Sequence, residues 1–179
     1  MALALFAFAA LPVAAAFVAY FSWSPSGGIN YGELIEPRPL PDAVLTAPGG
    51  EHFALSGFKG RWLLVQIGPS QCGADCLKRL FVMRQVRLMQ GKEMGRLERL
   101  WLLTDDGAPD AGLLRAYEGM QVGRGAAALL QLFPAEDDPR EHLYLIDPLG
   151  NLMLRFPRDA DPKGASKDLA RLLKVSHVG

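Results

Sequence analysis

The sequence predicts an α/β domain in which helices flank a mixed central sheet, held behind one N-terminal transmembrane helix. Three observations predict this arrangement. Residues 2–23 carry no charged side chain, the apolar run at 62–67 and the segment 97–104 are typical of central strands, and the stretch between them has the spacing of an amphipathic helix. Strands that alternate with helices in this way are typical of a sheet that is covered on both faces.

The first 23 residues are long enough to cross a bilayer, which takes about 20 apolar residues as a helix. Tyr20, Phe21 and Trp23 stand at the end of this run, where aromatic side chains favour the membrane interface. The alternative is a cleaved signal peptide, because the alanines at 14–16 are small residues of the kind that precede a cleavage site. We expect a single-pass anchor at residues 1–23.

Residues 24–48 are rich in Pro and Gly, and we expect them to form a stalk that wraps the domain. Proline fixes its own φ and pushes the preceding residue toward extended backbone, which argues against a helix or a central strand. The domain itself is expected at residues 49–179, a length that suits one hydrophobic core.

The other elements of the domain follow from apolar spacing and turn residues. The helix after the first strand is expected to bury residues that recur every three or four positions, from Leu77 to Met89. The segment 126–133 fits either a short helix or a packed loop. In chain order we expect a strand at 53–55, a strand at 62–67, a helix to residue 89, a strand at 97–104, a helix at 110–119, a hairpin of strands 143–146 and 152–156, and a helix at 168–175.

Composition excludes one class of partner. The formal net charge is zero at pH 7 and the predicted pI is about 6.8, so the chain lacks the basic surface that nucleic acid binding requires. We therefore expect no nucleic acid partner.

The only two cysteines, Cys72 and Cys76, lie where the first central strand gives way to the helix. A helix start carries a partial positive charge that stabilises a thiolate, the form that acts as nucleophile or metal ligand. Two soft thiolates would select Cu(I), whereas the same pair could instead cycle between dithiol and disulfide. In that case Cys72 would be the attacking thiol and Cys76 the resolving one. The alternative is that both are ordinary buried cysteines of a helix.

Two acidic residues follow the second central strand. Asp105 and Asp106 lie at its carboxyl end, the edge where α/β folds place their sites. The alternative, which we favour, is that they form a turn and a helix N-cap before Pro109.

The cysteine segment and two others resemble the SCO/SenC family of copper-handling proteins, within the thioredoxin-like superfamily. Residues 65–76 are similar to that family's strand, glycine and CxxxC loop, residues 102–109 to its strand with an acidic turn, and residues 144–150 to its final hairpin. The resemblance covers residues 50–175 and the anchor. It implies a thioredoxin-like fold, copper, and a partner that is the copper subunit of a respiratory (cytochrome c) oxidase or another assembly factor.

The resemblance also implies a copper-ligand histidine about five residues before Tyr144, where this sequence has Pro139. The nearest histidine is His142, which we keep as a candidate third metal ligand beside Cys72 and Cys76. The alternative is that a backbone carbonyl satisfies its ring. Without that histidine the pair is a two-thiol site, suited to Cu(I) transfer or dithiol chemistry rather than to Cu(II) storage.

The leading hypothesis is therefore an assembly factor rather than a turnover enzyme. It would be anchored in the inner (cytoplasmic) membrane with its domain on the periplasmic side, where thiol and copper chemistry of this kind takes place. It would deliver Cu(I) to the oxidase or keep the thiols of its copper site reduced. One alternative is a thiol-disulfide oxidoreductase that acts on other protein thiols, and a second is a non-catalytic interaction module.

Overall fold

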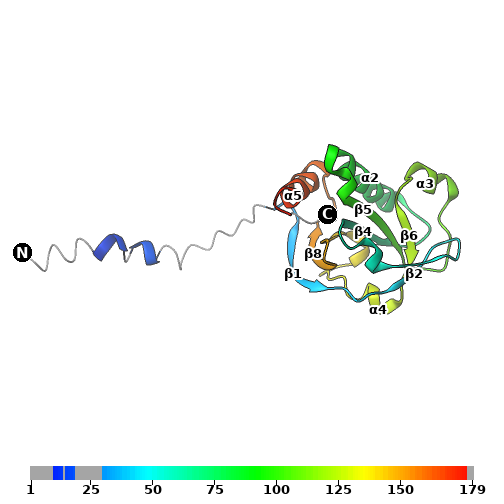
Figure 1. Ribbon diagram of the computed structural model, residues 1–179, viewed down its shortest axis with the longest axis horizontal. Coiled ribbons are helices and arrows are strands. Elements are labelled where there is room, and N and C mark those ends of the chain that lie inside the picture. The colour runs from blue at the N-terminus through cyan, green and yellow to red at the C-terminus, as the bar shows by residue number, and fades with distance from the viewer. Residues whose placement is uncertain (1–9, 14, 19–29, 177–179) are drawn as a thin grey trace, which may run out of the picture.

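In the computed structural model, residues 10–13, 15–18 and 30–176 are described. Residues 30–176 form one eight-stranded sheet with helices on both sides (Figure 1). The elements are β1 (Glu33–Pro39), β2 (Val44–Thr46), β3 (His52–Ala54), η1 (Leu55–Phe58), β4 (Trp62–Gly68), α2 (Ala74–Met89), η2 (Gly91–Arg96), β5 (Leu97–Leu103), α3 (Ala111–Ala116), β6 (Gln121–Arg124), α4 (Ala127–Leu130), η3 (Pro139–Glu141), β7 (Leu143–Ile146), β8 (Asn151–Phe156) and α5 (Pro162–Val175).

The strands lie in the order β1-β8-β7-β4-β5-β6-β2-β3. β4, β5 and β6 run parallel to one another, and the other neighbouring strands pair antiparallel. The predicted mixed sheet is therefore confirmed. Helix α2 joins the two central strands, β4 and β5, and supplies the crossover connection that parallel strands require.

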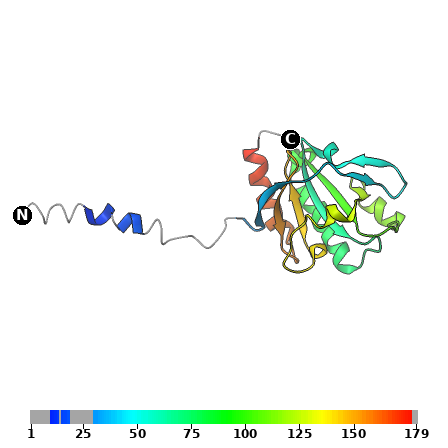
Figure 2. The same cartoon turned by 90° about the horizontal axis from the view of Figure 1, so that it is seen from below.

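Alternate residues of β4 supply the two halves of the core. Trp62 and Leu64 face α2 and α5, whereas Leu63 and Val65 belong to the cluster on the opposite face. Figures 1 and 2 show α2 and α5 together on one side of the sheet and α4 on the other. All seven residues of β4 are buried, so the strand is covered on both faces as its continuous apolar run predicts.

The helix α2 buries a narrower face than its apolar spacing predicts. Leu80, Met83 and Val86 are in the core, but Leu77 and Phe81 are 40% and 50% exposed. Leu88 and Met89, also expected inside, are about half exposed. The expected buried set was wrong at these four positions, because the helix presents only one stripe to the sheet and its solvent side remains partly apolar.

Within residues 30–48, the part of the Pro-rich segment that the structure describes, two short stretches form strands of the sheet. Residues 33–39 form β1, which pairs with β8 at one edge of the sheet, and residues 44–46 form β2 near the other edge. An edge strand tolerates Pro because one side of its ladder is unpaired. The backbone N–H of Gly32 also donates to the buried carboxylate of Asp168 in α5 at 2.7 Å, so this segment is part of the domain.

Two further elements differ from the sequence prediction. The strand β6 was missed because Gly123 interrupts its apolar pattern. A Cβ atom at Gly123 would lie 2.6 Å from the ring of Phe53, so close packing explains the glycine. The last helix begins at Pro162 rather than at 168, after Asp161, whose side chain accepts a hydrogen bond from the Gly164 N–H as an N-cap.

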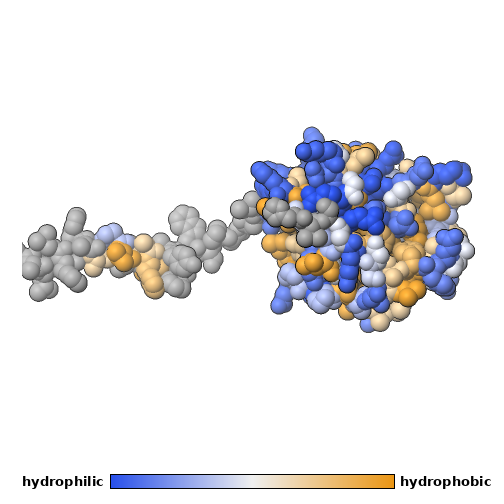
Figure 3. Space-filling model, viewed as in Figure 1, coloured by the Kyte–Doolittle hydropathy of each residue, from blue (hydrophilic) through white to orange (hydrophobic). Residues whose placement is uncertain are grey.

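The expected anchor at residues 1–23 falls mostly outside the described residues. The described parts, 10–13 and 15–18, are helical, and in Figure 3 they show mainly the hydrophobic colours. Within the described ranges of the chain, the helices are all too short or too polar to cross a bilayer. The anchor and its membrane orientation therefore stay predictions.

Candidate thiol site at the start of helix α2

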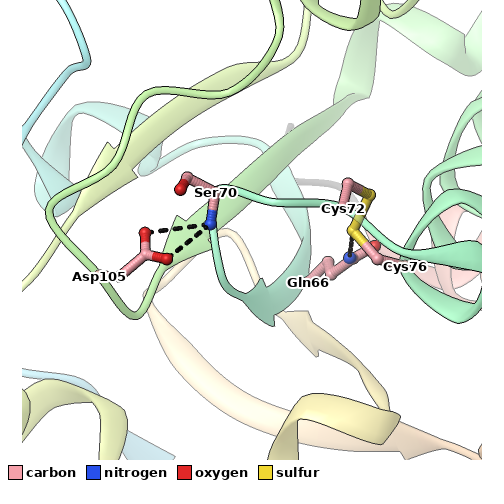
Figure 4. The surroundings of a disulfide bond; sticks show 5 residues. All are labelled: Gln66, Ser70, Cys72, Cys76 and Asp105. Carbon is pink, nitrogen blue, oxygen red and sulfur yellow. Dashed lines mark hydrogen bonds between the residues drawn. A yellow bond between two sulfur atoms is a disulfide. The ribbon is translucent and has the colours of Figure 1, made fainter.

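The two cysteines are brought together as a disulfide at the junction of β4 and α2 (Figure 4). Their Cα atoms are 5.2 Å apart. Cys72 lies in the loop before the helix and is partly exposed, whereas Cys76 lies in the first turn and is buried. This difference in exposure matches the predicted division between an attacking and a resolving thiol.

The helix start next to the disulfide has no side-chain cap. Gly73 occupies the N-cap position of α2 and has no side chain with which to accept from the first-turn N–H groups. By contrast, Asp110 and Asp161 cap α3 and α5 with their carboxylates. The amides of the first turn of α2 are therefore left to stabilise negative charge that develops on a nearby sulfur.

Behind the disulfide lies a buried polar side chain that the sequence prediction missed. Gln66 is fully buried in β4, and its Nε2 donates a hydrogen bond to the Sγ atom of Cys76 at 3.1 Å (Figure 4). The signal for it was present in the sequence, since Gln66 is the one polar residue in the apolar run 62–67. It lies on the face of β4 that packs against α2, two residues after Leu64.

The cysteine loop is tied to the carboxyl end of β5. The N–H of Ser70 donates to both carboxylate oxygens of Asp105, at 3.0 and 3.2 Å, and the Gly107 N–H donates to the same carboxylate. The hydrogen bond from the Ser70 N–H is the largest cause that holds the pKa of Asp105 below its usual range. A Cβ atom at Gly107 would lie 2.0 Å from Ser70 Oγ, so the two loops need a glycine here.

Asp105 and Asp106 therefore have different roles. Asp105 holds the cysteine loop, Asp106 forms an ion pair with Arg124 in β6, and the N-cap of α3 is Asp110. The expectation of a helix N-cap at 105–106 was wrong. Asp105 lies at the sheet edge that carries the thiols, as the first of the two interpretations expected, and it holds the cysteine loop in place.

His142 is held by two acceptors. Its Nδ1 lies 2.9 Å from the carbonyl oxygen of Phe156, and its Nε2 lies 2.6 Å from the carboxylate of Asp137. Both ring nitrogens therefore face hydrogen-bond acceptors, so neither has a lone pair directed at a metal. The same contact with His142 is the largest cause that lowers the pKa of Asp137.

The predicted metal ligands are not brought together as a three-ligand site. Across the described ranges, no group of three or more His, Cys, Asp or Glu side chains is placed to hold a metal ion. His142 is satisfied by a carbonyl, as the alternative interpretation expected, and also by a carboxylate. What remains is a pair of sulfurs that can exist as a disulfide or, once reduced, as two soft ligands suited to Cu(I).

Comparison with known proteins supports the fold. The family model described as "Transmembrane-like, thioredoxin-like, C-terminal domain" matches residues 62–176. A search of curated proteins returns no match.

Solved structures with this fold include two copper-bound Sco proteins. Yeast Sco1 with copper bound superposes with a TM-score of 0.64 and 18% identity, covering 79% of this chain and 96% of that one. Bradyrhizobium japonicum ScoI with copper bound superposes with a TM-score of 0.57 and 19% identity, covering 75% of this chain and 99% of that one. A putative protein disulfide isomerase from Bacteroides thetaiotaomicron superposes with a TM-score of 0.51 and 16% identity, covering 81% of this chain and 89% of that one. The expected resemblance to SCO/SenC proteins and the thioredoxin-like fold are thus confirmed.

Proposed function

The chain belongs to the family of transmembrane-like, thioredoxin-like C-terminal domains, and we propose that it is a membrane-anchored assembly factor for a respiratory oxidase, acting through Cys72 and Cys76. The observation that carries the proposal is the pair itself. One sulfur is partly exposed, the other is buried, and they are close enough to form a bond. The proposed task is to reduce a disulfide between the cysteines of the oxidase copper site to thiols before the metal is loaded.

The reaction is a two-electron exchange between the reduced Cys72–Cys76 dithiol and a disulfide of the client. The Cys72 thiolate attacks a disulfide of the client, which forms a mixed disulfide and releases one client thiolate. The Cys76 thiolate then attacks the Cys72 sulfur, which closes the Cys72–Cys76 disulfide and releases the second client thiolate. The client gains two electrons and the chain loses two, so a dithiol reductant must restore the chain after each cycle.

The geometry suits each step. Cys72 is the sulfur that a protein client can reach, because Cys76 is covered by the sheet. The uncapped start of α2 stabilises the attacking thiolate, and the Ser70–Asp105 contact holds the loop in place. Placement on the periplasmic side of the inner membrane is part of the proposal, since a disulfide client exists there.

A test uses the full chain and a soluble domain of an oxidase copper subunit whose copper-site cysteines are oxidised. Reduced wild-type chain should convert the client to its dithiol in equal amounts, scored by alkylation of the new thiols. Cys72→Ser should give none, and His142→Gln should match the wild type. If the wild type leaves the client oxidised while a small dithiol reduces it, the proposal is contradicted.

Cu(I) delivery is a second candidate, supported by two observations. Two proteins of the same fold were solved with copper bound, and the reduced pair offers two soft thiolates. Cu(I) would then be the cargo, held by Cys72 and Cys76 without His142, whose ring nitrogens are engaged. Titration of the reduced chain with Cu(I) against a competing chelator tests this. Cu(I) bound no more tightly by wild type than by Cys72→Ser would eliminate it.

The comparisons also leave two less specific functions as alternatives. The chain could act on other protein thiols, as the similarity in fold to a putative disulfide isomerase allows, or it could be an interaction module without thiol chemistry. Exchange with small disulfides but not with the oxidase domain would favour the first. Full function after replacement of both cysteines would favour the second.

A further inference from the structure

We propose that Gln66 is a positioning residue that holds the Cys76 sulfur and stabilises its negative charge when the disulfide opens or closes. This inference rests on the proposed thiol exchange and concerns its second step. Gln66 does not contact the client. It acts through the resolving cysteine.

The first observation is direct contact. Gln66 Nε2, from strand β4, donates to Cys76 Sγ at 3.1 Å (Figure 4). Both partners are buried, so water does not compete for the sulfur. A hydrogen bond to a charged acceptor is stronger than one to a neutral acceptor, so this donor stabilises a thiolate more than it stabilises a disulfide.

The second observation is that Gln66 is costly to bury. Its Oε1 atom is buried and, within the part of the chain that the structure describes, has no hydrogen-bond partner. Its neighbours in register are Trp101 of β5 and Leu143 of β7, which are both core residues. An unpaired buried carbonyl destabilises a fold by about 1–3 kcal/mol, and an apolar residue of similar size would avoid that cost. Stability therefore does not explain an amide at this position.

The third observation concerns the space beside the amide. An added Cβ at Gly68 would lie 3.8 Å from Gln66 Nε2 and 3.8 Å from Trp101 Nε1. The Trp101 Nε1–H is also buried without a partner among the described residues. Both nitrogens thus lie in ordinary contact distance of that position, and of these two donors the Gln66 amide is the one that is bonded to the sulfur.

These contacts assign the step at which Gln66 acts. When Cys76 attacks the mixed disulfide on Cys72, its sulfur starts as a thiolate. When an external thiol attacks Cys72 of the closed disulfide, the electron pair of the broken S–S bond passes to Cys76, which leaves as a thiolate. In both directions the charge on Cys76 is next to Gln66 Nε2. The first attack, by Cys72 on a client, involves the other sulfur and is not assisted.

An aromatic disulfide that releases a coloured thiol separates the two steps. Reduced full-length chain releases one equivalent when Cys72 attacks and a second when Cys76 resolves the mixed disulfide. We expect Gln66→Leu to leave the first release unchanged and to slow the second about tenfold, which corresponds to one charge-assisted hydrogen bond. Gln66→Met keeps the length of the side chain without an N–H donor and should be slowed as much.

Two matched variants control for shape and general polarity. Gly68→Ala adds a methyl at ordinary contact distance and keeps the donor, and Trp101→Phe removes the donor that has no partner. Both variants should release the second equivalent at a rate within about twofold of wild type. Loss of the donor, by contrast, should slow that release about tenfold. The thermal midpoint of Gln66→Leu should equal or exceed that of wild type, because the unpaired carbonyl is gone.

The outcomes distinguish this inference from the function on which it rests. If wild type releases a single equivalent, the exchange function fails. If wild type releases two equivalents and Gln66→Leu resolves as fast, the exchange function stands and the role of Gln66 is refuted. An equal slowing of both releases would also refute it, since that result would indicate general disruption of the site.

Discussion

The start of α2 and the start of β7 each present side chains that proteins use for redox or metal chemistry, but the two places leave those side chains in opposite states. At α2, the Cys72 residue is partly exposed, the helix has no side-chain cap, and the buried Cys76 sulfur accepts a hydrogen bond from Gln66 Nε2. At β7, both ring nitrogens of His142 meet acceptors at 2.6 and 2.9 Å. The sulfurs can change partners, whereas the imidazole is fully engaged.

This difference supports the proposal that the cysteine pair, and not His142, carries the chemistry. A reactive group needs an accessible atom and an environment that stabilises its charged form, and the cysteine pair has both. His142 instead joins the segment before β7 to the end of β8 through Phe156. We therefore assign it to stability, and the predictions below separate these two roles.

The largest expected effect is that of Cys72→Ser, which should abolish reduction of any disulfide substrate. The serine hydroxyl is not a nucleophile toward sulfur at neutral pH, and the partly exposed sulfur is the one that a substrate reaches. Stopped-flow measurement with a small disulfide checks this. The far-UV spectrum should stay native, which shows that the fold is intact. Residual exchange faster than about a tenth of the wild-type rate would mean that Cys76 attacks directly.

Replacement of His142 by Leu should act on stability alone. The change leaves the Phe156 carbonyl and Asp137 without their partner, which should lower the free energy of unfolding by about 1–3 kcal/mol. Urea denaturation of the reduced and oxidised chain measures it. The rate of thiol exchange should not change. A large fall in Cu(I) affinity with normal stability would reverse the assignment and restore His142 as a ligand.

Gly107→Ala should cause a smaller loss of stability. The added methyl meets Ser70 Oγ, so the cysteine loop must shift or the serine must rotate, at a cost of about 1–2 kcal/mol. Gly73→Ala is the matched control, because nothing lies within 4 Å of its added Cβ. Thermal unfolding of the two variants compares them. Equal midpoints would show that the loop is not held against β5.

The smallest effect should come from Asp105→Asn, and it should depend on pH. The pKa of Asp105 is lowered in the folded chain, so its contribution to stability is present above about pH 4, the unfolded value, and is lost as the pH falls through the lower folded value. Solvent screens most of the charge of Asp105, so Asp105→Asn should change the free energy of unfolding by less than about 1 kcal/mol at pH 7. Denaturation curves from pH 7 to pH 2.5 should converge. A constant difference would contradict this role.

The sequence predicted the parts of the fold whose apolar pattern is strong. β4, α2, β5 and the hairpin of β7 and β8 lie where their patterns place them, because each buries a continuous or periodic apolar face. β1 and β6 were missed because Pro37 and Gly123 break the pattern, although tertiary pairing at a sheet edge and close packing accommodate both. The local sequence pattern does not show which distant segments will pair with a strand or pack against it.

The site divides in the same way. Cys72 and Cys76 could be predicted from their spacing at a strand–helix junction. The roles of Gln66 and Asp105 could not, because each depends on a contact between distant parts of the chain: β4 with α2, and the loop after β5 with Ser70. Polar residues inside apolar runs are the signal that could have pointed to Gln66.

The central claim is that Cys72 and Cys76 form an exchangeable pair rather than a structural bridge, and the reduction potential of the full-length wild type tests it most directly. Equilibration with glutathione buffers of known ratio, followed by alkylation of free thiols, gives the value. We predict a potential between about −120 and −270 mV, the range of thiol-exchange proteins. A value below about −300 mV, typical of structural disulfides, would contradict the account.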